Sequence, residues 1–172
     1  MKKHTQIYNK HLFLFLGFCL LITTTLRGQG SISIKASATV VEVTGIELVP
    51  MKDMIVDEAS SKEGILNISP VTDDKAGKIL VRGKVNAQVR LTYVRDLLLT
   101  NSAGDGAMIF KYSLSGLKSD NQGASQLIDQ VERIVQFNEK GEFYLWLGGE
   151  VDLSKAKPGS YEGEFTIDIE YI

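Results

Sequence analysis

Two histidines and one cysteine are the residues of this 172-residue chain best suited to nucleophilic or zinc chemistry. His4, His11 and Cys19 all lie near the N-terminus, so a mature chain without that end has neither an imidazole nor a thiol. A Ser-His-Asp triad, a Cys-His pair and a zinc site of His or Cys ligands are then excluded. The sequence also contains no G-x-S-x-G element, phosphate-binding loop or dinucleotide fingerprint.

Carboxylates are the remaining candidates for catalysis. Glu162, Glu164, Asp168 and Glu170 alternate with apolar residues, and neighbours on one strand face would lie ~7 Å apart. Such pairs suit the acid–base chemistry of glycosidases, so a carboxylate-based hydrolase is one alternative. A solvated acidic face explains the same pattern, because these residues occupy the polar positions of the strand. We therefore expect no enzyme and no catalytic residue.

Oxygen-rich turns are candidates for calcium binding. Asp73 with Asp74, and Asn101 with Asp105, lie in two such turns. Neither has the spacing of an EF-hand, and Asp and Asn are common turn formers. We predict no metal site and no cofactor, with a weak calcium site as the open alternative.

The N-terminal segment has the layout of a secretory signal peptide. Residues 1–11 are basic, residues 12–22 are an unbroken apolar run, and residues 23–30 are polar and end in Gly-Gln-Gly. The apolar run is much shorter than the ~20 residues that span a bilayer. We predict a signal peptide over residues 1–30 and an exported single domain over 31–172, in the periplasm, at the cell surface or outside the cell, with no membrane span after cleavage.

Charge and cysteine content limit the partners of the exported domain. The whole chain has 19 basic and 21 acidic residues, and residues 1–30 take four basic residues and no acidic one, which leaves 15 against 21. An acidic domain is a poor partner for nucleic acid or anionic lipid, so we predict no nucleic acid partner. Without cysteine there is no disulfide, and stability must come from a buried core and strand pairing.

Alternation of apolar and polar residues dominates the exported part. It is clearest over residues 159–171 and 31–40, and its phase slips by one residue at Val40-Val41, as at a β-bulge. Further strands are predicted at 65–69, 78–84, 88–94, 108–114, 134–138 and 143–147, separated by Gly-, Asp- and Asn-rich turns. The pattern predicts an all-β, antiparallel β-sandwich. One helical turn is predicted within 125–135, with Ser125 as its cap.

Several segments together resemble one family. The closing PGSYEGEFTIDIEY (158–171), the WLGGEVDL segment (146–153), the LTNSAGDGAM segment (99–108) and the paired strands of 78–94 are similar, in this order, to segments of bacterial domain-of-unknown-function family 4402. Residues 115–140 show no clear match. The resemblance implies an exported sandwich related to fimbrial subunits and spore-coat-U-like proteins, with an immunoglobulin-like outline. It implies no established activity.

Two surfaces are candidates for binding a partner. Fimbrial-like sandwiches pair terminal strands between subunits or with an assembly chaperone, and both ends of this domain alternate. The candidate residues are Ile32, Ile34, Ala36, Ala38, Val40 and Tyr171. The alternative is that residues 31–43 pair within their own domain.

An aromatic pair is the second candidate surface. Tyr144 and Trp146 lie in a segment that is apolar on both faces, and they could form a platform for a cell-surface glycan or a protein. The alternative is a central strand whose outer face is covered by the 115–135 segment. The leading prediction is a non-enzymatic structural or surface protein, such as a subunit of a fimbria-like assembly. The second prediction is a carbohydrate- or protein-binding module.

Overall fold

The computed structural model describes residues 32–40, 45–54, 64–104, 106–129, 132–157 and 159–172, with the main chain alone for 32–40 and 164. The predicted signal peptide and the phase slip after Val40 therefore lie outside the described residues. No helix in the described ranges is long and apolar enough to cross a membrane.

Strands make up almost all the regular structure of the described residues. They are β1 (Ile32–Val40), β2 (Glu47–Lys52), β3 (Ile65–Ile68), β4 (Gly77–Arg82), β5 (Gln88–Tyr93), β6 (Asp96–Asn101), β7 (Ala107–Leu117), β8 (Gln126–Ile128), β9 (Glu132–Gln136), β10 (Glu142–Asp152) and β11 (Gly159–Tyr171). A single turn of 3₁₀ helix, η3 (Gln122–Ala124), precedes β8. The all-β, sandwich-type fold predicted from the alternation is confirmed.

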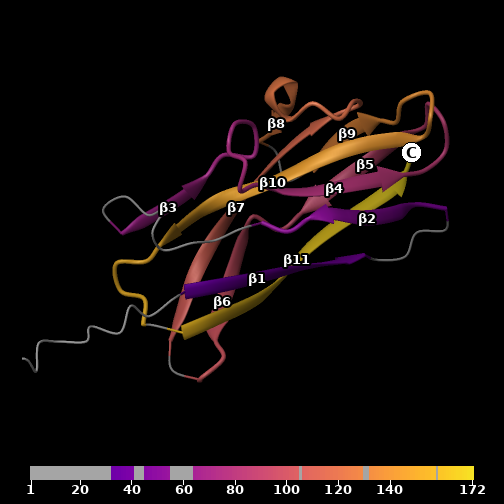
Figure 1. The fold of residues 1–172 in the computed structure, drawn as a ribbon. Helices are drawn as coiled ribbons and strands as arrows, with labels where there is room; N and C mark the ends of the chain where they lie inside the picture. Colours follow the sequence, from indigo (N-terminus) through magenta and orange to yellow (C-terminus); the bar gives the residue numbers. More distant parts are fainter. Residues whose placement is uncertain (1–31, 41–44, 55–63, 105, 130–131, 158) are drawn as a thin grey trace, which may run out of the picture.

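The strands form one curled sheet whose two ends face each other as layers (Figure 1). The order is β2-β4-β10-β7-β6-β11-β5-β9, with β3 on β10, β8 on β7 and β1 on β11. The β5 and β6 strands pair end to end with the same edge of β11. The β6 strand also pairs with β7, and this joins one layer to the other. Every pair is antiparallel except β1 with β11.

The core fills the concave side of the sheet. On β11, Tyr161, Phe165, Ile167 and Ile169 are buried, and the intervening residues with described side chains are partly or fully exposed. The same alternation places one face of β5, β7 and β10 in the core. Burying one face of each strand stabilises the sheet by removing apolar area from water, with no disulfide among the described residues.

The sequence pattern mispredicts the structure of residues 125–135. The helical turn expected within 125–135 is wrong: β8 and β9 occupy it, and the helical turn lies earlier, at η3. Ser125 does not begin a helix but follows the end of η3, where its N–H donates to Gln122 O (2.9 Å). Its buried hydroxyl contacts the Ser115 hydroxyl (2.8 Å) and donates to Gln122 O (2.6 Å). The alternation also does not predict β2, which contains a proline, or β6, which follows closely on β5.

Gly148 and Gly149 of β10 are required by close approach of main chain. A Cβ atom on Gly148 would collide with the carbonyl oxygen of Ile68, and one on Gly149 with the Phe110 ring. Gly149 also has a φ of 156°. The pair therefore lets β3 and the segment after it cross close to β10.

Replacing Gly148 with alanine is expected to destabilise the fold by about 1–3 kcal/mol, because a main-chain carbonyl cannot move aside as a side-chain tip can. Gly123→Ala is the matched control, since the nearest atom to its Cβ is 3.9 Å away. Chemical denaturation of the two variants tests this. Equal stabilities would contradict it.

Candidate functional site: the β1–β11 pair and its closure by Tyr171

The N-terminal strand lies along the C-terminal strand over its whole length. In Figure 1, β1 (indigo) and β11 (yellow) run side by side, and their register runs from Ile32 opposite Gly159 to Val40 opposite Ile167. The two strands are parallel, so β1 is not a hairpin partner of β11 but reaches it from the other end of the chain.

Register pairs the five candidate residues of β1 with one set of alternate positions on β11. Positions 32, 34, 36, 38 and 40 lie opposite Gly159, Tyr161, Gly163, Phe165 and Ile167. Tyr161, Phe165 and Ile167 are buried, and residues in register on parallel strands share a face. The alternation of β1 thus agrees in phase with that of β11.

The strand β1 is attached through one edge. Among the described strands, β11 alone pairs with it. The edge of β11 that β1 covers is opposite the edge that takes β5 and β6. Detaching β1 would therefore break its pairing with β11 and no other described strand pair.

Tyr171 closes the end of β11. Its hydroxyl accepts a hydrogen bond from Lys84 N (2.9 Å) and donates one to Gly45 O (2.9 Å). The Lys84 ammonium lies 5.1 Å from the ring centroid, a cation–π distance. Tyr171, a candidate partner-binding residue, thus ties the end of β11 to the β4–β5 turn and to the residue close before β2.

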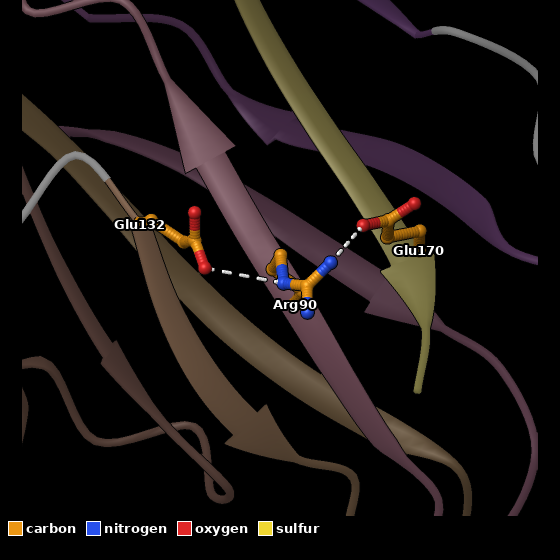
Figure 2. Close-up of polar contacts among 3 residues, drawn as sticks. All are labelled: Arg90, Glu132 and Glu170. Carbon is orange, nitrogen blue, oxygen red and sulfur yellow. Dashed lines mark hydrogen bonds and ion pairs between the residues drawn. The ribbon is translucent and has the colours of Figure 1, made fainter.

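Charged residues on the outer face of the same layer form ion pairs with one another. Figure 2 shows Arg90 on β5 between Glu132 on β9 and Glu170 on β11, at 3.2 Å and 2.6 Å. Exposed ion pairs of this kind contribute little stability, and here they link the outer faces of three neighbouring strands. Glu170 is therefore engaged in a structural ion pair rather than paired with a second carboxylate.

The other acidic candidates lie on the exposed face. Glu162 and Asp168 are both exposed, six positions apart on β11, and the side chain of Glu164 is not described. The described residues contain no group of three or more His, Cys, Asp or Glu side chains placed to hold a metal ion. This arrangement has the features of a solvated strand face.

The two candidate calcium turns are closed by their own side chains. Asp73 Oδ1 accepts a hydrogen bond from Lys75 N (2.9 Å), and Asn101 Oδ1 accepts one from Ala103 N (2.9 Å). These are Asx turns, in which the side chain mimics a turn of main chain. Asp105 lies outside the described residues.

The aromatic pair is divided between surface and interior. Tyr144 is half-buried, while Trp146 is 2% exposed and lies outside the main core cluster. Trp146 is in register with Ser115, whose hydroxyl donates to Pro70 O (2.9 Å), so the segment after β3 is fastened beside it. Only Tyr144 of the pair is available at the surface.

No protein-family model matches the chain, and no curated protein matches it. The family resemblance of the closing strand and of the Gly-Gly segment therefore stays a prediction. The contacts of β1 and Tyr171 could not have been read from the sequence, because their partners lie at distant positions such as Gly45 and Lys84.

Removing the Tyr171 hydroxyl is expected to lower the free energy of unfolding by about 0.5–1.5 kcal/mol, since two hydrogen bonds, from Lys84 N and to Gly45 O, are lost. Tyr112→Phe is the matched control, because the Tyr112 hydroxyl is buried with no hydrogen-bond partner among the described residues. That control should be neutral or stabilising. Urea denaturation of both variants measures the difference, and a Tyr171→Phe variant as stable as the parent would contradict the role of Tyr171.

Proposed function

We propose that the protein is an exported, non-enzymatic structural protein, a subunit of a fimbria-like surface assembly whose terminal strands pair between copies. The observation that carries the proposal is the parallel pairing of β1 with β11 of the same chain, in register over nine residue pairs, with β11 the one partner of β1 among the described strands. A strand from a second copy can make the same main-chain hydrogen bonds to β11.

The order of the strands supports this proposal. A constant-type immunoglobulin sandwich has strands A-B-E-D in one sheet and C-F-G in the other. Within the one sheet, the runs β2-β4-β10-β7 and β5-β11-β1, joined through β6, resemble this order. In this comparison β2, β4, β5, β7, β10 and β11 take the places of A to F in chain order. The position of G is occupied by β1, which comes first in the chain.

Exchange of β1 between copies costs little free energy at equilibrium. Each copy would lose its own β1–β11 pairs and regain the same pairs with a neighbour. The Tyr171 bonds go to Gly45 and Lys84, which are not part of β1, so the domain can keep them while β1 leaves. If each copy donates to the next without returning, the exchange produces a chain of subunits.

Deleting residues 31–39 tests the proposal. We expect the intact protein to form multimers whose size rises with protein concentration, and the deleted protein to remain monomeric or to aggregate through the open edge of β11. Size-exclusion chromatography with light scattering distinguishes these states. Identical, stable monomers of both proteins at high concentration would contradict strand exchange.

A peptide of residues 31–40 is expected to bind the deleted protein and restore its thermal stability, because it refills the edge of β11. The matched control is a peptide of the same composition with apolar and polar positions interchanged, which places the polar side chains toward the core. Equal stabilisation by both peptides would show that the register of β1 does not matter.

A further inference from the structure

A groove beside Tyr144 lies away from the β1–β11 pair. Its walls are residues 118–120, which lead from β7 toward η3, and residues 138–142, which form the turn between β9 and β10. Tyr144 lies between them on β10. The groove is open to solvent on one side and has a volume of about 480 Å³.

One amide side chain holds the two walls together. Asn138 Nδ2 donates to Lys118 O (2.8 Å), and Asn138 Oδ1 accepts from Lys140 N (2.8 Å) and Glu142 N (2.9 Å). Lys118 Nζ also donates to Gln136 Oε1 (2.6 Å). The groove is therefore built before any ligand arrives, and binding would not have to order its walls.

The groups around Tyr144 are held in place as well. The Tyr144 hydroxyl donates to Glu142 Oε2 (3.2 Å), and the Lys78 ammonium lies 5.5 Å from the Tyr144 ring centroid and 2.5 Å from Asp120 Oδ1. Burial and the Glu142 carboxylate raise the pKa of Tyr144, so its hydroxyl stays protonated at neutral pH. The Trp146 ring stacks with Tyr144 at a centroid distance of 6.3 Å. The site thus presents the exposed part of a fixed aromatic ring, with the Glu142 and Asp120 carboxylates and the Lys78 ammonium around it.

The chemistry of the lining favours a neutral, hydroxyl-rich ligand. Two ammonium groups, three carboxylates, an amide and two hydroxyls surround the groove, so donors and acceptors are mixed and the two charges nearly balance. The side chains of Ser119, Glu139 and Lys140 have no polar partner among the described residues, which leaves them to a ligand. An anion would meet the carboxylates, whereas a sugar hydroxyl can donate to them and accept from the lysines.

We propose that this groove binds a neutral saccharide, with a sugar ring against Tyr144 and its hydroxyls bonded to residues 118–120 and 138–142. The proposal does not depend on strand exchange, because the groove and the β1–β11 pair share no residue. It gives the protein a recognition site in addition to an assembly strand.

Calorimetric titration of the full chain with maltose, lactose and diacetylchitobiose, at millimolar concentrations, tests the proposal. At least one sugar should bind, and Tyr144→Ala should weaken that binding about tenfold or more through loss of the ring. Tyr144→Phe should keep most of the affinity. Glu150→Ala, an exposed change on the same strand outside the groove, should leave binding unchanged.

A second variant keeps the test decisive if Tyr144→Ala unfolds. Ser119→Arg fills the groove from an exposed position whose side chain has no polar partner among the described residues, so it should abolish binding and leave the unfolding temperature unchanged. Failure of all three sugars to bind, or binding that survives Ser119→Arg, would overturn the proposal. Binding of inorganic phosphate or acetate at this site in place of the sugars would overturn it too.

Discussion

Main-chain pairing along both edges of β11 is the constraint on which the two-layered arrangement depends. One edge takes β5 and then β6, and the other takes β1. Because β6 also pairs with β7, the first of these edges joins the two layers. The second edge would expose a row of unpaired N–H and C=O groups next to the core if β1 were absent, and such an edge readily pairs with another strand.

Polar ties at the margins keep the ends of this arrangement in place. Tyr171 fastens the end of β11 to Gly45 and Lys84, and Asn138 fastens the β9–β10 turn to Lys118. Arg90 links the outer faces of β9, β5 and β11 (Figure 2). Each tie joins segments distant in sequence. Two of these contacts engage Glu170, a candidate for catalysis, and Tyr171, a candidate for partner binding, in structural roles.

Alternation in the sequence was sufficient for the fold class and for the closing strand, because a half-buried strand must repeat every two residues. It failed where a strand is short, contains proline or follows directly on another strand, as in β2, β6 and β8. The apolar spacing of 125–135 imitated a helix, because residues such as Leu127 and Ile134 are exposed and do not report a buried face.

The candidate sites were predictable only in part. The phase of β1 and the surface position of Tyr144 follow from strand periodicity, whereas the burial of Trp146 depends on the segment after β3. The parallel register of β1 and the groove walls arise from tertiary contacts that no local pattern encodes. Pairing of β1 with β11 in its own chain and pairing with β11 of a second copy have the same register, so the sequence pattern does not distinguish them.

Disulfide trapping between separate chains tests the central claim most directly. Lys35 and Glu162 are in register, so cysteines at these positions meet the Cα spacing of a disulfide. In a Cys19→Ser background, Lys35→Cys chains are mixed with Glu162→Cys chains and oxidised, with Lys35→Cys and Asp168→Cys chains as the off-register control. Strand exchange predicts a disulfide-linked heterodimer from the first mixture and little from the control. No heterodimer from the first mixture, with efficient internal disulfide formation when both cysteines are in one chain, would contradict it.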